Sequence, residues 1–175
     1  MHRSVVNDSR INKSDGTVMY VKNELKYEII NEKYNKMCST SVKIKLSNKS
    51  TVKVTGIYWC HDFEIKSFIS DLEELVKESS ECKNHLIIGD TNIDLIDFNK
   101  EAEKYLYLLQ ENGYQSIINS CTFPKHGLEE GSCLDHIFMQ SKFVAPSAKL
   151  IDKITDHYLV LHTQFYAKMD ILKWL

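Results

Sequence analysis

The sequence predicts an α+β domain in which two β-sheets pack face to face and helices lie outside them. Three observations predict it. Short apolar segments typical of strands occur in both halves of the chain, two segments have helical periodicity, and acidic residues accompany several strands. With 175 residues, 43% of them hydrophobic, the chain can bury one substantial core. We therefore expect a single domain over residues 1–175, with a C-terminal tail from residue 166.

Composition excludes several classes of protein. A formal net charge of -2 gives no overall basic field, so any nucleic acid would be held by a local patch or by a metal. The five cysteines form no Cys-x-x-Cys pair, which argues against a disulfide framework and against a zinc knuckle. No segment resembles a membrane span, and the first ten residues lack the apolar core of a signal peptide. We expect an intracellular protein without a membrane partner.

The first predicted strands lie in the N-terminal third. The segment DGTVMYVKNEL begins with an Asp-Gly turn and continues with β-forming residues, which predicts a strand over Thr17–Lys22. Two alternating apolar runs around the polar segment at residues 47–50 predict a hairpin. Its second arm loses the alternation at GIYW, residues 56–59, as a strand does when both of its faces become buried. We expect that arm deep in the sheet.

Two helices and a buried strand follow. Apolar residues keep helical spacing over residues 62–80, where Asp62 can cap the N-terminus. A second helical pattern covers residues 101–113 and stops at Gly113. Between them, HLIIG at residues 85–89 is short and apolar, which is typical of a strand buried on both faces and ended by its glycine.

The remainder of the chain again has the pattern of short strands. Each candidate is ended by polar residues, glycine or proline. The predicted strands are SIIN (116–119), SCLDHIFM (132–139), AKLID (148–152) and HYLVLHTQF (157–165).

Asp90, Asn92 and Asp94 follow the buried strand directly. Loops at the C-terminal ends of buried strands commonly carry functional groups, so these acceptors are candidates for a site. The alternative is a turn, because Asp and Asn bond their own backbone and glycine permits positive φ. Taken alone, the GDxN pattern favours the turn.

Two further acids accompany predicted strands. Asp135 lies in the middle of SCLDHIFM, where a carboxylate needs a cation, a histidine or a metal. Asp156 and His157 point to opposite sides of an extended chain, so each needs its own partner. One solution pairs His157 with Asp135 and places Asp156 at a cation with Asp90 and Asn92. The alternatives are a partly exposed edge position for Asp135 and a loop for the Asp-His pair.

The ordered motifs GDxN, SxLDHI and TDH, each beside a strand, resemble the signature of the endonuclease/exonuclease/phosphatase superfamily. DGTVMYVKNEL, VTGIYWCHDFEIKSFISDLEELV and LLQENGYQSIINSCTF resemble the endonuclease domain of jockey-type non-LTR retrotransposons. The likeness spans roughly residues 10–165. It implies a four-layer αββα sandwich of the deoxyribonuclease I type, a magnesium or manganese ion, and hydrolysis of phosphodiester bonds in DNA. It also implies a nuclear location and a reverse transcriptase domain in the parent element.

The resemblance assigns catalytic roles to five residues. Asp90 would activate or orient the attacking water, and Asn92 would hydrogen-bond the phosphate. His157, held by Asp135, would contact the phosphoryl oxygen. Tyr58, in the segment GIYW, would touch the phosphate. In-line displacement at phosphorus needs an aligned nucleophile and neutralised charge, which a metal and a cationic histidine supply together.

The metal site is the incomplete part of the resemblance. Asp156 would lie at the metal with Asp90 and Asn92. The asparagine and the glutamate that the family carries on its first strands have no counterpart here. Asn7 and Asp8 follow no predicted buried strand, and Glu24 comes after the YVKN segment. We expect the first strands to be missing and catalysis to be impaired. The alternatives are an inactive mobile-element remnant and a phosphatase or deadenylase of the same fold.

Overall fold

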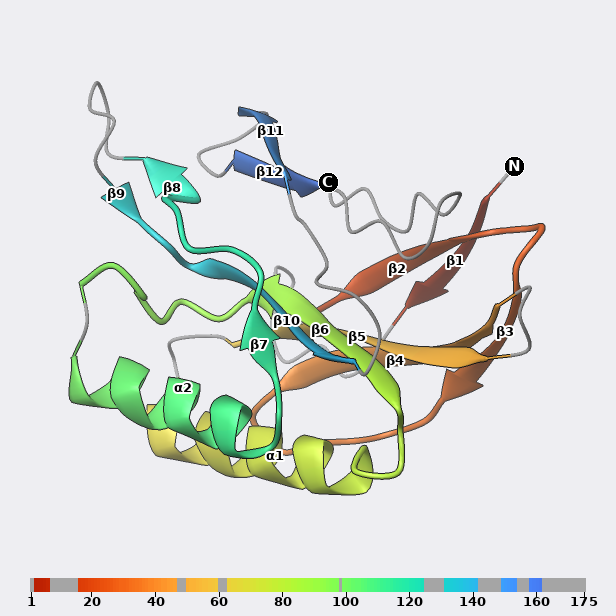
Figure 1. Ribbon diagram of the computed structural model, residues 1–175, viewed down its shortest axis with the longest axis horizontal. Helices are drawn as coiled ribbons and strands as arrows, with labels where there is room; N and C mark the ends of the chain where they lie inside the picture. The colour runs from red at the N-terminus through yellow and green to blue at the C-terminus, as the bar shows by residue number, and fades with distance from the viewer. Residues whose placement is uncertain are drawn as a thin grey trace.

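The computed structural model describes residues 2–6, 16–46, 50–59, 63–97, 99–124, 131–141, 149–153 and 158–161. Its largest sheet contains β3 (Lys26–Ile30), β4 (Cys38–Lys45), β5 (Thr51–Tyr58), β6 (Asn84–Asp90), β7 (Gln115–Ser116) and β10 (Asp135–Ser141). The spatial order is β3-β4-β5-β6-β10-β7 (Figure 1). Neighbouring strands are antiparallel except β5 and β6, which are parallel.

Helices cover one face of this sheet. α1 (Ile65–Glu78) connects the parallel strands β5 and β6, which need such a crossover, and α2 (Lys100–Glu111) follows β6. Figure 1 shows both helices on one side of the sheet and two strand pairs on the other. Neither helix of the described part is long and apolar enough to cross a membrane.

Among the described residues, three antiparallel strand pairs accompany the central sheet. The two pairs opposite the helices are β1 (His2–Val6) with β2 (Val18–Lys22), and β11 (Lys149–Lys153) with β12 (Tyr158–Leu161). The third pair, β8 (Phe123–Pro124) with β9 (Gly131–Ser132), precedes β10 in the chain.

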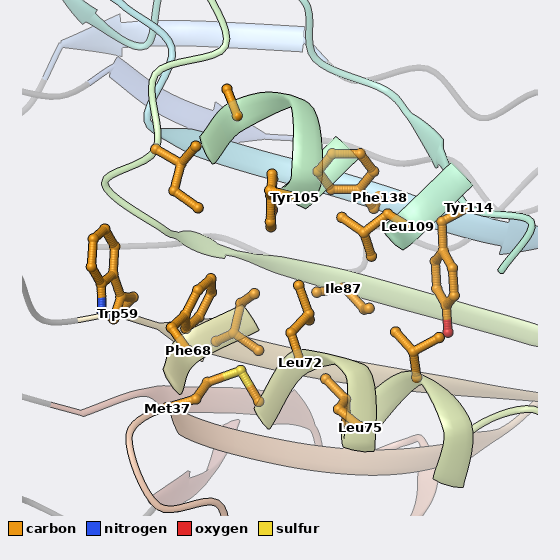
Figure 2. Packing of buried hydrophobic residues seen from close by; sticks show 14 residues of the cluster. Met37, Trp59, Phe68, Leu72, Leu75, Ile87, Tyr105, Leu109, Tyr114 and Phe138 are labelled. Carbon is orange, nitrogen blue, oxygen red and sulfur yellow. The ribbon is translucent and has the colours of Figure 1, made fainter. Parts of the chain in front are cut away.

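Hydrophobic cores lie on both faces of the central sheet. On the helix face, Phe68 of α1 and Tyr105 of α2 pack in one cluster with Ile87 of β6 (Figure 2). On the opposite face, Val21 of β2 shares a cluster with Ile88 of β6. Successive side chains of β6 therefore enter different cores, which explains its continuous apolar run.

The predicted architecture is confirmed. The hairpin around residues 47–50 is the β4–β5 pair, and β5 lies inside the sheet between β4 and β6. Both predicted helices form, and Gly113 after α2 has a φ of 78°, the left-handed conformation that commonly ends helices. The described residues supply one helix layer and the stacked β layers of the predicted αββα arrangement.

Two predictions about the ends of elements are wrong. α1 begins at Ile65 with Glu64 at the N-cap position and without a side-chain cap, so a cap at Asp62 does not fit; Asp62 itself lies outside the described residues. Gly89 does not end its strand, because β6 continues to Asp90. A Cβ at position 89 would lie 1.8 Å from the Ile57 carbonyl oxygen, so glycine is needed for the close approach of β5.

Two predicted strand positions also change. β7 comprises Gln115–Ser116 and overlaps the expected SIIN strand only at its first residue. The Ser116 hydroxyl donates to the Ile118 carbonyl at 2.8 Å and turns the chain there. At the N-terminus, β1 ends just before residue 7 and pairs with β2, where the sequence predicted no buried strand.

Candidate active site

Three strand ends place candidate side chains at one edge of the central sheet. Tyr58 is the last residue of β5, Asp90 the last of β6, and Asp135 the first of β10. Asp90 is the register partner of Tyr58 in the parallel ladder and of Asp135 in the antiparallel ladder. Partners in register present their side chains on the same face, and directly opposite Cβ atoms lie about 5 Å apart. The structure therefore brings three predicted site residues together.

This site lies on the face turned away from the helices. Side chains alternate along a strand, so Asp90 shares a face with Ile88, and Asp135 shares one with Ile137. Both isoleucines belong to the core that includes Val21 of β2. The carboxylates thus lie at the end of the core between the two β layers, on the face of the central sheet opposite the helices.

The position of Asp135 in its strand differs from the prediction. It is the first residue of β10 and is half-buried, so the argument from a carboxylate in mid-strand is wrong. The preceding backbone is held by a side chain: the N–H groups of Leu134 and Asp135 both donate to Thr122 Oγ1 at 3.0 Å. The Thr122 hydroxyl accepts the hydrogen bonds that a neighbouring strand would otherwise accept. The pairing of β10 with β6 therefore begins at Asp135, and the Asp135 carboxylate lies at the end of the sheet.

The loop after β6 is both a turn and part of the site. Asn92 has a φ of 51°, and its N–H donates to Asp90 Oδ1 at 3.0 Å. Its side-chain Nδ2 donates to the Trp59 carbonyl at 2.8 Å, while the Trp59 N–H donates to the Asp90 carbonyl at 3.2 Å. The Trp59 ring stacks on Phe68 of α1 with centroids 5.6 Å apart. The GDxN segment is therefore both a turn and a candidate site, because the turn orients the Asp90 carboxylate.

Asp94 links this loop to the strand that carries Asp135. Its Oδ1 accepts hydrogen bonds from the N–H groups of Ile96 at 2.9 Å and Cys133 at 3.0 Å. Burial acts to raise the pKa of Asp94, but hydrogen bonds from Ser132 and from backbone N–H groups outweigh it and hold the pKa below its ordinary value. Asp94 thus links the residues just before β10 to the loop after β6.

A histidine that the sequence assigned to no site lies behind the carboxylates. His136 follows Asp135, so its side chain lies on the helix face, where its Nδ1 is 2.9 Å from Thr91 Oγ1 and 3.0 Å from Tyr105 Oη. The sequence signal was its position beside a candidate acid. That signal does not separate a functional histidine from one packed in the core.

Asp156 and His157 lie outside the described residues, immediately before β12. Their convergence with Asp90 and Asp135 stays a prediction, as does the pairing of His157 with Asp135. The expected strands around them do form: β12 pairs with β11 in antiparallel orientation.

The donor chemistry of the site fits a hard divalent cation. Magnesium takes oxygen ligands and is often held by one or two carboxylates together with water and substrate phosphates. Asp90 supplies a carboxylate and Asn92 an amide oxygen in the adjoining loop, and Asp135 lies beside Asp90 in register. Within the described ranges, no group of three or more His, Cys, Asp or Glu side chains is assembled for a metal. Asp156, the other predicted acidic ligand, lies outside the described residues.

Comparisons of sequence give no match: no protein-family model and no curated protein matches this chain. Comparisons of structure do. An endonuclease/exonuclease/phosphatase family protein from Leptotrichia buccalis superposes with a TM-score of 0.67 at 13% identity, over 94% of this chain and 72% of that one.

Two other solved structures carry activities in their names. The mannosyl-6-phosphatase of Bacteroides thetaiotaomicron has a TM-score of 0.60 at 12% identity, over 94% of this chain and 77% of its own. The 3'-5' exonuclease of Neisseria meningitidis has a TM-score of 0.55 at 14% identity, over 90% of this chain and 77% of its own. At these identities the likeness establishes architecture and leaves chemistry open. The chain has the fold of the endonuclease/exonuclease/phosphatase proteins.

Proposed function

We propose that this chain is a metal-dependent phosphodiester hydrolase that acts on DNA. The observation that supports it is the register pairing of Asp90 with both Tyr58 and Asp135 at one end of the sheet. Carboxylates at a site repel a phosphate ester. A divalent cation overcomes this repulsion, and it is a common device in phosphoryl transfer.

The chain's own residues would each contribute to hydrolysis. Asp90, held by the Asn92 N–H, would orient or deprotonate the attacking water. The Asn92 amide has two N–H groups, and with one bonded to the Trp59 carbonyl the other would donate to a phosphate oxygen. Tyr58 would contact the phosphate from β5. Magnesium or manganese at Asp90 and Asn92 would neutralise charge that develops on the phosphate oxygens.

Asp156 and His157 complete the proposed site. Asp156 would face the metal, and His157, paired with Asp135, would contact the phosphoryl oxygen as a cation. Both residues immediately precede β12. The proposal requires that segment to reach the ends of β6 and β10.

DNA as the substrate and a jockey-type retrotransposon as the origin are supported by the retrotransposon-like segments that flank the shared motifs. In such an element the chain would act in the nucleus beside a reverse transcriptase domain. The glutamate that the resemblance implies has no counterpart among the residues we assign to the site. We therefore expect slow catalysis, because fewer carboxylates hold the ion and its water less firmly.

A phosphomonoesterase is the second candidate. The mannosyl-6-phosphatase of Bacteroides thetaiotaomicron shares the fold over 94% of this chain. Phosphate monoesters and diesters make similar demands on a metal and a general base, so the fold does not separate them. Substrate assays do.

A nicking assay tests the proposal. The purified chain is incubated with supercoiled plasmid and magnesium or manganese, with and without EDTA, and in parallel with p-nitrophenyl phosphate. We expect nicked circles that EDTA abolishes. Asp90→Asn should reduce nicking by at least about 100-fold, the usual contribution of a general base. Asp97→Asn is the matched control, because Asp97 is an exposed acid in the same loop.

The outcomes separate the candidates. Release of p-nitrophenol without nicking would favour the phosphomonoesterase. A folded chain that acts on neither substrate would be an inactive remnant. Nicking that survives in Asp90→Asn would place the chemistry elsewhere or in a contaminant.

A further inference from the structure

Three buried side chains from three different elements meet behind the candidate carboxylates. Thr91 follows β6, Tyr105 lies on α2, and His136 lies on β10; we call them the buried triad. His136 is 2% exposed, and the other two are fully buried. The His136 Nδ1 atom is 2.9 Å from Thr91 Oγ1 and 3.0 Å from Tyr105 Oη. The Tyr105 and His136 rings also pack, with centroids 5.4 Å apart.

The hydrogen bonds of His136 fix its tautomer. Its Nε2 is 3.0 Å from the Cys133 carbonyl oxygen, which can only accept, so Nε2 carries the proton. Burial is the main cause that lowers the pKa of His136 to about 4, so the ring is neutral near pH 7. Nδ1 then has a lone pair and accepts from a hydroxyl of Thr91 or Tyr105. Every polar atom of the ring is therefore engaged.

The triad is coupled to the site through adjacent residues. Thr91 directly follows Asp90, and His136 directly follows Asp135. Because neighbouring residues of an extended chain point to opposite faces, a bond between Thr91 and His136 on the helix face ties together the backbone that carries the two acids on the other. The Thr91 N–H also donates to the Leu134 carbonyl at 3.0 Å.

We propose that the buried triad of Thr91, Tyr105 and His136 is a positioning device that fixes the separation of the Asp90 and Asp135 carboxylates. The inference rests on the proposed function for its purpose, since a phosphate and its cation require carboxylates held to within about 0.5 Å. His136 is a positioning residue in this account, because its ring lies behind the carboxylate face. Tyr105 connects α2 to this device, because the position of α2 determines where the Tyr105 hydroxyl lies relative to the His136 ring.

The same sheet contains a matched control. His85 of β6 is also fully buried, and its ring nitrogens lie 2.8 Å from Thr55 Oγ1 and 2.6 Å from Tyr114 Oη. His85 pairs with Lys53, at the opposite end of the β5–β6 ladder from Asp90. Tyr105→Phe therefore removes a hydroxyl beside the buried histidine near the site. Tyr114→Phe removes a hydroxyl beside the buried histidine far from it.

Amide hydrogen exchange of the full chain, measured by NMR without metal, tests the inference. In Tyr105→Phe the protection of the Thr91 and Asp135 amides should fall by about tenfold more than global stability explains, the effect of losing one buried hydrogen bond. Tyr114→Phe should leave these amides unchanged relative to global stability. Thr91→Val should reproduce the loss, and Thr91→Ser, which keeps the hydroxyl, should restore protection.

Manganese binding to the same variants gives a second measurement. Tyr105→Phe should weaken the manganese Kd by about tenfold, whereas Tyr114→Phe should not. The inference is overturned if both tyrosine variants loosen Thr91 and Asp135 equally, because the triad would then be ordinary core. If the unmodified chain binds no manganese and cleaves nothing while Tyr105→Phe still loosens these two amides selectively, the proposed function fails and the positioning of the carboxylates stands.

Discussion

Asp135 lies directly opposite Asp90 across the antiparallel pair of β6 and β10, at the end of each strand. Two carboxylates in that relation are unfavourable in a sheet unless something of opposite charge lies between them. Tyr58 continues the row on β5, so the edge presents two acids and a phenol side by side. A row of this composition suits a site that receives a cation and an anionic substrate.

We predict that Asp135→Asn impairs hydrolysis and changes the stability of the metal-free chain little. The amide keeps the size of the side chain but loses the charge that would hold His157 as a cation, so nicking should fall by about 100-fold. The free energy of unfolding should change by less than about 1 kcal/mol, because Asp135 is half-buried at the end of the sheet. Urea unfolding in EDTA measures the stability. A larger loss of stability in Asp135→Asn would show that the carboxylate serves the fold more than the site.

Gly89→Ala should be strongly destabilising. The added Cβ would lie 1.8 Å from the Ile57 carbonyl oxygen of β5, so the two central strands would have to separate; we expect a loss of about 3 kcal/mol or more. Gly113→Ala is the control, because its Cβ would meet its nearest neighbour at 3.6 Å and the φ of 78° alone costs about 1 kcal/mol. Equal losses in urea unfolding would contradict the close approach of β5 and β6.

The chain should lose stability as the pH falls from about 6.5 to about 4. Burial holds the pKa of His136 at about 4, below its ordinary 6.5, so over this range the unfolded chain binds the proton that the folded chain refuses. At 1.36 kcal/mol per pKa unit, this histidine alone removes up to about 3 kcal/mol. His85 acts in the same direction, because burial and then Lys53 lower its pKa.

Urea midpoints measured across that pH range test the prediction. Asp94 does not confuse the result: its pKa is lowered from 3.8, so the stability it contributes is lost only below that value. His136→Leu should flatten part of the slope. A midpoint that stays constant down to about pH 4.5 would mean that these rings are hydrated in solution.

The buried ion pair Lys53–Glu32 should respond unequally to loss of either partner. The Lys53 side chain is 2% exposed and the Glu32 side chain 14%, with Nζ and Oε1 2.5 Å apart. Glu32→Ala leaves a buried ammonium and should cost about 3 kcal/mol, whereas Lys53→Met leaves a carboxylate that can reach water and should cost less. Glu73→Ala, in the exposed pair with Lys77, should change stability by less than about 0.5 kcal/mol. Equal costs for the Lys53 and Glu32 variants would contradict this asymmetry.

Local patterns predicted the elements, because burial and helical spacing are properties of short segments. The β4–β5 hairpin, the internal position of β5 and the end of α2 near Gly113 all followed from such patterns. The failures depend on distant residues. Asp135 begins its strand because Thr122 captures the preceding N–H groups, and Gly89 is required by Ile57 on another strand.

For the site too, the sequence indicated which residues belong together but not how distant strands align. The order of the motifs indicated that Asp90 and Asp135 belong together, the family resemblance added Tyr58, and the register places the three in one row. Sequence could not supply the register itself, because pairing is decided by both strands at once. It also passed over His136, since a histidine in an apolar strand has the same pattern whether it fills a core or bonds Thr91 and Tyr105.

Paramagnetic broadening by manganese tests the central claim most directly. The labelled full chain is titrated with substoichiometric manganese, and the loss of each backbone amide signal is followed by NMR. We predict one centre of broadening that includes Asp90, Asn92 and Asp135 together with Asp156 and His157. Asp90→Asn should abolish it. Broadening centred on the exposed acids of α1, such as Glu73 and Glu74, with Asp90 and Asp135 unaffected, would contradict it.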